Sequence, residues 1–450
     1  MQIFSVYDIL LTPIYLVLIF VVANYLRPRL TNKNTVRYYF PALGIKLSGG
    51  IVFALLYHFY YGGGDTTAFY IGSQRIWQTF LDSPVAGVQL LFTRAGDLDP
   101  VVTGYVRNIR FFYNANEWNL IKIAGLFGLF CFNTHLVISC FFAFFCFLGL
   151  WQFYKTILKF FPSFHFIFAI AIFLTPSAIF WGSGIMKDTI ALGALGFLFA
   201  ASMNVVYFRK RNLIQIIILL GAATLLFSMK SYLFLIYMAA FGIWGFLKFQ
   251  ESLKNPILKI LSLPFVAGIG LVVGYLGITQ IAQSTEYNSI DIIQERVYVY
   301  QMDHTLRAGG STYSLDVDVT SPVSVIAAFP KAVNVALFRP YPWEASSSVV
   351  LIAAFESSIY FLITLYILFV TGPIQTFKNV FGDPELAMLL AFTIVLAFAI
   401  GITSYNFGAL ARFKIQLLPF FGCALAILYR KPKVKRKRKY MVDSQELERF

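Results

Sequence analysis

Long apolar stretches recur along the whole sequence and constrain the fold more than any other feature. Each is about 20 residues long, which is enough to cross the roughly 30 Å hydrocarbon core of a bilayer as a helix. Every backbone N–H and C=O must be paired inside such a core, so only helices and closed barrels can span it. Charged residues make up 13% of the chain, against about 25% in a soluble domain. The sequence therefore predicts an all-α polytopic membrane protein.

The apolar stretches predict about 11 transmembrane helices in a single transmembrane domain over residues 1–430, followed by a basic tail at 431–450. The segment 117–130 is apolar but short, and it fits either an interfacial helix or part of a longer span. The expected spans are 7–26, 38–61, 132–154, 164–181, 188–208, 213–228, 231–248, 256–281, 347–370, 386–404 and 413–429.

Basic residues gather in alternate connections, and the positive-inside rule places these connections in the cytoplasm. This predicts a multi-pass protein of the cell inner (plasma) membrane, with an extracytoplasmic N-terminus and a cytoplasmic C-terminus. A basic cluster next to a span meets anionic lipid, so we expect membrane lipids as partners and no nucleic acid. The basic connections are 27–37, 154–159, 209–211, 248–259 and 430–439.

The same orientation leaves two large extracytoplasmic loops, 62–131 and 282–346, which we expect to carry short interfacial helices. Several cations lie on this disfavoured side, and a cation retained there indicates an anionic partner. Arg and Lys bind phosphate groups strongly, so a phosphate or diphosphate on a lipid carrier is the expected ligand. The candidate substrate-binding residues in these loops and in the short turns are Lys187, Asp188, Lys230, Arg339 and Arg412.

Each of these residues also has a purely structural interpretation. Lys187 and Lys230 can extend along apolar surface to the lipid headgroups. Asp188 opens a span, where a negative charge is favoured by the helix dipole. Arg412 can pair with a carboxylate of the chain.

The stretch GGGDTTAFY at 62–70 opens the first large loop with three glycines and a carboxylate, Asp65. Glycines let a backbone approach another molecule closely, and a carboxylate at the membrane surface can act as a general base on an acceptor hydroxyl. The segment after it has near-helical apolar spacing, which is typical of a helix lying in the interface. The alternative for Asp65 is an N-cap of that helix.

The second large loop ends in LFRPYPWEA at 337–345, which brings Arg339, Tyr341, Trp343 and Glu344 together. Aromatic faces there can stack on sugar rings, and the alternative is an aromatic belt at the interface. Glu356 lies inside an apolar span, where a charge is costly and usually faces the bundle interior. Lys46 is one candidate partner for it.

The chain resembles the GT-C glycosyltransferases, multi-span enzymes that take sugars from polyprenyl-phosphate donors. GGGDTTAFY resembles the GD-x-x-x-Y form of their acidic signature, and NFGALARFKIQLLP at 406–419 resembles a late Arg-Phe/Tyr-x-x-x-x-x-Pro pattern. The resemblance implies that Asp65 is the catalytic base and that Lys187, Arg339 and Arg412 bind the donor phosphate. It places Tyr70 in the signature. A divalent metal ion stays open as a cofactor, with Asp97 and Asp99 as candidate ligands.

We therefore expect an integral-membrane glycosyltransferase that moves a sugar from a polyprenyl-phosphate or diphosphate carrier to a hydroxyl of a glycan or lipid acceptor. One alternative is a polysaccharide polymerase or ligase acting on lipid-linked sugars. Another is a transporter or flippase for lipid-linked glycans. Transporters usually have discontinuous helices and substrate sites near the middle of the membrane, in two related halves. The sequence shows no such halves and its polar residues gather on one face, which favours an enzyme; repeat symmetry in the fold would favour the transporter instead.

Overall fold

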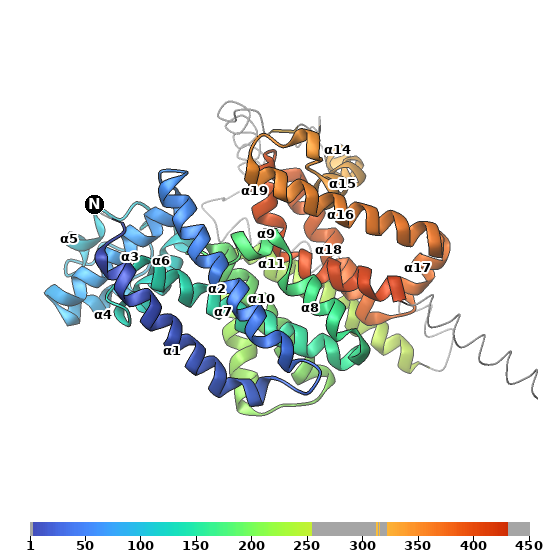
Figure 1. Cartoon of the computed structure of the whole chain (residues 1–450), viewed down its shortest axis with the longest axis horizontal. Coiled ribbons are helices and arrows are strands. Elements are labelled where there is room, and N and C mark those ends of the chain that lie inside the picture. Colours follow the sequence, from blue (N-terminus) through green and yellow to red (C-terminus); the bar gives the residue numbers. More distant parts are fainter. Residues whose placement is uncertain (1–2, 254–311, 314, 316–321, 431–450) are drawn as a thin grey trace, which may run out of the picture. The chain divides into compact units, whose positions relative to one another are not determined.

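The computed structural model describes residues 3–253, 312–313, 315 and 322–430, and the named elements in these ranges are all helices (Figure 1). Seven of the described helices are long and apolar enough to cross a membrane, or eight if the bent pair Phe407–Gln416 and Leu418–Arg430 forms one span. This confirms an all-helical, multi-pass chain. The expected span 256–281 and most of the loop 282–346 lie outside the described residues.

The chain forms two compact units, which we describe separately. Unit 1 comprises the residues up to His165 together with Phe173–Phe234. Its helices are α1 (Val6–Leu30), α2 (Val36–Phe59), α3 (Asp65–Asp82), α4 (Pro84–Phe92), α5 (Thr103–Val106), α6 (Ala115–Leu129), α7 (His135–Phe160), α9 (Pro176–Trp181), α10 (Lys187–Ser202) and the first part of α11 (Leu213–Ser252).

The core of unit 1 is the crossing of α7 and α10, where glycines let the two backbones touch. A Cβ on Gly149 would lie 2.0 Å from the Gly193 carbonyl oxygen, and one on Gly196 would lie 2.3 Å from the Gly149 carbonyl oxygen. Small residues at such crossings are how membrane helices pack, because lipid supplies no hydrophobic force between them.

One end of unit 1 gathers its basic connections. Trp151 and Lys155 of α7 donate hydrogen bonds to the carbonyls of Leu30 and Arg29, at 2.9 and 3.3 Å. Lys159 donates to Asn204, 2.6 Å away, just before the basic run 209–211. We call this the basic end. It places three of the predicted basic connections together, as the charge pattern requires.

The opposite end carries the start of α1, the end of α2 and the start of α7. The Phe4 ring lies 4.7 Å from the His58 ring and 5.2 Å from the His135 ring. Asp8 is buried there and accepts a hydrogen bond from the Leu136 backbone N–H, 2.9 Å away. We call this the polar end. Asp65 begins α3 at the same end, because α3 follows α2 directly.

The expected span 164–181 forms two short helices. α7 ends at the basic end and α10 starts at the polar end, so the chain between them must cross back. It does so as α8 (His165–Phe173) and α9, separated at Leu174 and Thr175. Pro176 accounts for the break, because the proline ring disfavours the helical conformation in the residue before it, Thr175.

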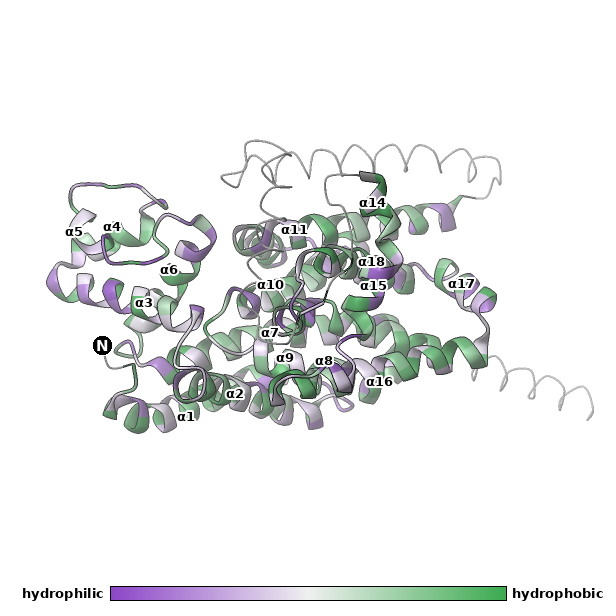
Figure 2. Ribbon diagram, turned by 90° about the horizontal axis from the view of Figure 1, so that it is seen from above, coloured by the Kyte–Doolittle hydropathy of each residue, from purple (hydrophilic) through white to green (hydrophobic). Residues whose placement is uncertain are grey.

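Helices α3 to α6 form a separate layer at the polar end, and none of them qualifies as a span (Figure 2). The expected interfacial segment after Asp65 is helical, but its apolar face does not meet lipid. Phe69 and Ile76 are buried, and a Cβ on Gly125 of α6 would lie 2.8 Å from the Ile76 side chain. The face is therefore covered by α6, which corrects that expectation. The apolar segment 117–130 is α6 itself.

Unit 2 comprises Phe166–Ile172 and the residues from Leu235 onward. A buried interface joins α15 and α18, where a Cβ on Gly401 would lie 2.2 Å from the Ala332 carbonyl oxygen. Its described helices are most of α8, the last part of α11, α14 (Pro322–Ala327), α15 (Phe329–Phe338), α16 (Ser348–Thr371), α17 (Pro373–Phe381), α18 (Pro384–Thr403), α19 (Phe407–Phe413) and the helix Leu418–Arg430.

Two predicted boundaries coincide with breaks in the backbone. The spans 213–228 and 231–248 form one continuous element, α11, but Lys230 between them is non-helical, with φ −150° and ψ 83°. The last expected span, 413–429, belongs to a pair of helices bent by 67°. The boundary of the two units also follows Lys230 closely, at Phe234.

Candidate functional site

Asp65 stands at an exposed turn at the polar end of unit 1. Gly62, Gly63 and Gly64 have φ values of 68°, 126° and 148°, which favour glycine because a side chain is rarely tolerated there. Gly64 is the N-cap of α3, and Asp65 is its first residue. The N-cap interpretation of Asp65 is therefore wrong by one position. Its carboxylate lies in the first turn, where the helix dipole favours a negative charge.

Tyr70 belongs to the core of the α3 layer. Its side chain is 4% exposed, and its hydroxyl donates a hydrogen bond to the Asn133 carbonyl, 2.9 Å away. Burial and the nearby Asp8 raise its pKa. Tyr70 also follows Asp65 by five positions, one more than in the GD-x-x-x-Y form. This residue supports α3 and does not present a surface to a substrate.

Lys187 forms an ion pair with Glu117 of α6. Both side chains are partly exposed, at 18% and 15%. Glu117 lies in the first turn of α6, and Lys187 is the first residue of α10. The pair therefore joins the α3–α6 layer to the membrane helices of unit 1.

Asp188 forms an ion pair with Lys230, the non-helical residue of α11. Their side chains are 0% and 7% exposed. A charge at this burial must be paired, and the pairing holds the start of α10 against the break in α11. The pairing and the burial favour a structural role for Lys230, and its role in binding phosphate stays a prediction.

Arg339 and Glu344 form a second partly exposed pair, in unit 2. The guanidinium donates two hydrogen bonds to the Glu344 carboxylate, one of them from Nε at 3.1 Å. The Tyr341 backbone N–H donates a third, at 2.8 Å. Burial would raise the pKa of Glu344, but these hydrogen bonds lower it below its ordinary value.

Two aromatic rings also contact the Arg339 guanidinium. Its guanidinium carbon lies 5.6 Å from the centre of the Tyr313 ring and 5.1 Å from that of Phe407. Tyr313 is fixed in turn, because its hydroxyl donates to the Gly401 carbonyl at 3.0 Å and burial raises its pKa. A guanidinium has five N–H donors, so Arg339 keeps donors beyond those that Glu344 takes.

Tyr341, which is half-buried, and Trp343, which is exposed, form an aromatic pair near Arg339. Their ring centroids lie 5.0 Å apart and nearly parallel, and Trp343 is 80% exposed. Arg412 of α19 is half-buried and lies over the Phe413 ring at 5.6 Å. Asp65, Lys187, Asp188 and Lys230 belong to unit 1, while Arg339, Trp343, Glu344 and Arg412 belong to unit 2. Their convergence into one site stays a prediction.

Lys46 belongs to unit 1 and Glu356 to unit 2, so their pairing stays a prediction. Lys46 donates to the Ala178 carbonyl in unit 1, at 2.7 Å. Glu356 is 5% exposed and interacts electrostatically with Lys414, which is 1% exposed. Lys414 also donates to the Ser357 hydroxyl at 2.5 Å. The buried charges therefore meet beside the bend that follows α19.

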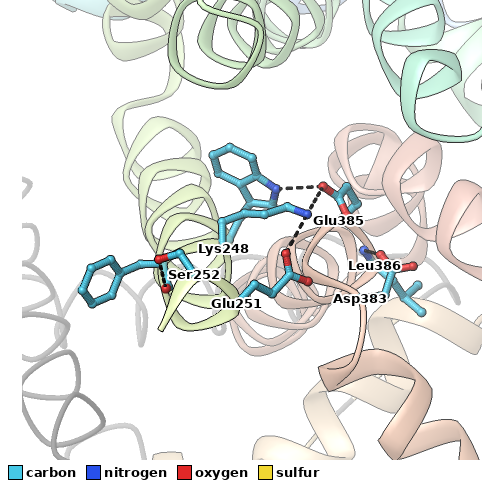
Figure 3. A network of polar contacts seen from close by, with 8 residues as sticks. Lys248, Glu251, Ser252, Asp383, Glu385 and Leu386 are labelled. Atoms are coloured by element: carbon cyan, nitrogen blue, oxygen red, sulfur yellow. Dashed lines mark hydrogen bonds and ion pairs between the residues drawn. The ribbon is translucent and has the colours of Figure 1, made fainter. Parts of the chain in front are cut away.

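A further ionic network of unit 2 lies where the end of α11 meets the start of α18. Lys248 of α11 contacts Glu385 at 3.1 Å and Glu251 at 3.2 Å, and Figure 3 shows its amine pointing toward both carboxylates. Trp244 donates to Glu385 at 3.4 Å. Asp383 caps α18 by accepting from the Leu386 backbone N–H. The network fastens the end of α11 to the start of α18.

The carboxylates suggested for a metal do not form a site. Asp99 accepts a hydrogen bond from the Val101 backbone N–H, 2.8 Å away, as in a turn. No group of three His, Cys, Asp or Glu side chains within the described residues could hold a metal ion.

Comparison with known protein families, curated proteins and solved structures finds no match for this chain. Its function has to be argued from the residues themselves.

The sequence pattern identified the cations and placed Glu344 beside Arg339, but it did not connect Lys187 with Glu117 or Lys230 with Asp188. Glu117 lies at the start of the apolar segment 117–130. No sequence pattern connects it to Lys187, which is 70 positions away. Lys414 lies at the start of the expected span 413–429, where a basic residue usually marks the end of a membrane helix. Its burial beside Ser357 depends on the bend between the two last helices, for which the sequence gives no signal.

Proposed function

We propose that the chain is an integral-membrane glycosyltransferase of the GT-C-like kind. It would transfer a sugar from a polyprenyl-phosphate or diphosphate carrier to a hydroxyl acceptor on the extracytoplasmic face of the inner (plasma) membrane. The proposal retains about 11 spans, an extracytoplasmic N-terminus and a cytoplasmic C-terminus. Its main support is Asp65, an exposed carboxylate that follows the end of a candidate span and three glycines of positive φ.

The charge distribution of unit 1 supports the orientation. The connections at the basic end carry cations, while Asp8, Asp65, Glu117 and Asp188 lie at the polar end. Under the positive-inside rule the basic end is cytoplasmic. Asp65 then lies on the extracytoplasmic face, where a lipid-linked sugar and its acceptor would meet.

In the proposed reaction Asp65 acts as the general base. It removes the proton of the acceptor hydroxyl as that oxygen attacks the anomeric carbon, and the carrier phosphate leaves with the bonding electrons. Cations near the leaving phosphate lower the barrier by stabilising its charge. Arg339 and Arg412 are the candidates in unit 2, and Lys187 is the candidate in unit 1.

Exposure separates these cations from Lys230. Lys187 and Arg339 are 18% and 22% exposed, so a phosphate can reach them without unfolding the core. Glu344 fixes the guanidinium plane of Arg339, and a planar fork binds phosphate in a defined orientation. The exposed Trp343 ring, which stacks on the half-buried Tyr341 ring, offers a face for stacking on a sugar.

Asp65→Asn tests the proposal. It preserves size and removes basicity, so turnover should fall about 10²-fold or more, while the lost dipole interaction should cost at most about 1 kcal/mol of stability. Turnover is measured as release of polyprenyl phosphate from lipid-linked sugars extracted from the host membrane. Asp82→Asn, at the other end of α3, is the matched control. Normal turnover in the Asp65 variant would remove Asp65 from the mechanism.

A transporter of lipid-linked glycans is the second candidate, and the bent pair of helices favours it. Discontinuous helices with buried charges mark substrate or ion pathways in transporters, and Glu356 and Lys414 lie beside such a bend. A transporter would move a lipid-linked glycan across proteoliposomes with the sugar–phosphate bond intact, and Asp65→Asn would leave that movement unchanged.

A further inference from the structure

Helix α17 (Pro373–Phe381) connects two candidate membrane spans through very short joints. α16 ends at Thr371, and Gly372, with φ 78°, turns the chain into α17. α18 begins at Pro384, three residues after α17 ends. A nine-residue helix is about 14 Å long, too short to cross the bilayer. Its tethers therefore confine it to the level where α16 leaves the membrane and α18 enters it.

The side chains of α17 divide it into two faces. Ile374, Phe377 and Phe381 follow the i, i+3, i+7 spacing of one helical face, and they are 73%, 65% and 56% exposed. The other face carries Gln375 and Asn379, which hydrogen-bond to each other at 3.0 Å. None of the residues of α17 is buried, and the helix shows both green and purple in Figure 2. The described chain leaves this apolar face uncovered.

The neighbouring span indicates what covers it. Phe369, in the last turn of α16, is 90% exposed, as a lipid-facing residue of a span should be. The exposed apolar face of α17 follows only a few residues later in the chain.

The charges around α17 suit a lipid headgroup layer. Lys378 is exposed beside the apolar face, from where a long side chain can reach toward headgroups. Arg430 lies near the same end of unit 2, because the ring centroid of the preceding residue, Tyr429, lies 6.0 Å from that of Tyr366 in α16. Cations at this position attract anionic lipid.

We propose that α17 is an interfacial helix that binds the lipid surface. Ile374, Phe377 and Phe381 enter the boundary between headgroups and acyl chains, about 5–10 Å below the surface. Lys378 contacts the phosphates of anionic lipids. This inference does not depend on the proposed glycosyltransferase activity.

Nitroxide labels on single cysteines test the proposal in the full chain, reconstituted into nanodiscs of phosphatidylethanolamine and phosphatidylglycerol. The test positions are Ile374→Cys and Phe377→Cys, and the matched controls on the polar face are Gln375→Cys and Asn379→Cys. The four native cysteines are buried, so the unsubstituted chain gives the background signal. Frequent collision with oxygen indicates that a label lies in lipid, and frequent collision with a water-soluble nickel chelate indicates that it lies in water.

The proposal expects the labels at 374 and 377 to collide several times more often with oxygen than with the nickel chelate. The labels at 375 and 379 should show the reverse. Equal access of nickel to all four positions would overturn it, because the helix would then lie in water. Shielding from both reagents, with spin–spin broadening between labels at 377, would also overturn it, because a second copy of the chain would then cover the face.

Discussion

The buried ion pair between Asp188 and Lys230 offers the sharpest test of how unit 1 is held together. It joins the first turn of α10 to the break in α11, and its members are 0% and 7% exposed. Lys230→Met removes the ammonium and leaves the Asp188 carboxylate buried without its cation. Asp188→Asn does the opposite. The double variant removes both charges.

The magnitude follows from the burial. Removing one partner of a buried pair costs about 3–5 kcal/mol, whereas replacing both partners is often nearly neutral. Each single variant should therefore lose about 3 kcal/mol or more, and the double variant should recover most of that loss. With two single losses of about 3 kcal/mol each and a nearly neutral double variant, the coupling energy between the positions should reach about 4–6 kcal/mol, more than is usual for residues in direct contact.

Thermal unfolding of the purified variants in detergent, followed by tryptophan fluorescence, measures the losses relative to the unsubstituted chain. Lys187→Met is the matched control, because its pair with Glu117 is partly exposed and should contribute less. Additive losses at Asp188 and Lys230 would refute the reasoning. So would a stable Lys230→Met variant whose binding of polyprenyl phosphate alone is reduced, since Lys230 would then act on a ligand.

Three further predictions concern single contacts. Asp8→Ala should cost about 1–3 kcal/mol by leaving the Leu136 N–H unpaired, whereas Asp8→Asn should cost less in the same melts. Gly149→Ala should destabilise by at least about 1–3 kcal/mol through overpacking against Gly193; Gly221→Ala, where a Cβ meets nothing within 4 Å, should be neutral or stabilising. The lowered pKa of Glu344 means that its pairing stabilises the fold above pH 4.5 and that this stabilisation is lost as the pH falls through the folded-state pKa. Glu344→Gln should therefore flatten the fall of melting temperature with acidification below that pH.

Periodicity and charge predicted the coarse architecture because both act locally along the chain. Apolar runs such as 6–30 and 36–59 need about 20 residues to cross a bilayer, so their position shows directly in the sequence. The basic runs near Arg29, Lys159 and Arg209 assigned three connections to one end, and the hydrogen bonds of unit 1 gather them there. The break at Lys230 was visible because a lysine interrupts an apolar run.

The sequence places Glu344 near its partner Arg339, but the partners of Lys187 and Lys230 were not predictable, because they lie on distant helices. The 164–181 segment looked like an ordinary span, yet Pro176 divides it. α3 looked interfacial because its apolar face is real, and only the docking of α6 through Gly125 shows that this face is covered by protein. A periodicity identifies a face but not what covers it.

The pairing of the outer cations changes the argument about phosphate. Lys187, Lys230 and Arg339 were expected to need an anion from outside, but the chain supplies a carboxylate to each of them. Cation position alone therefore says little about a ligand, and exposure becomes the better criterion. By exposure, Lys230 is the weakest candidate for binding phosphate, and Lys187, in a partly exposed ion pair, is a better one. Arg339 is the best candidate, because its remaining N–H donors and its fixed guanidinium plane suit a phosphate. Replacing Arg339 with Lys keeps the charge but loses the fork, so phosphate recognition there should depend on the geometry of the guanidinium more than on its charge.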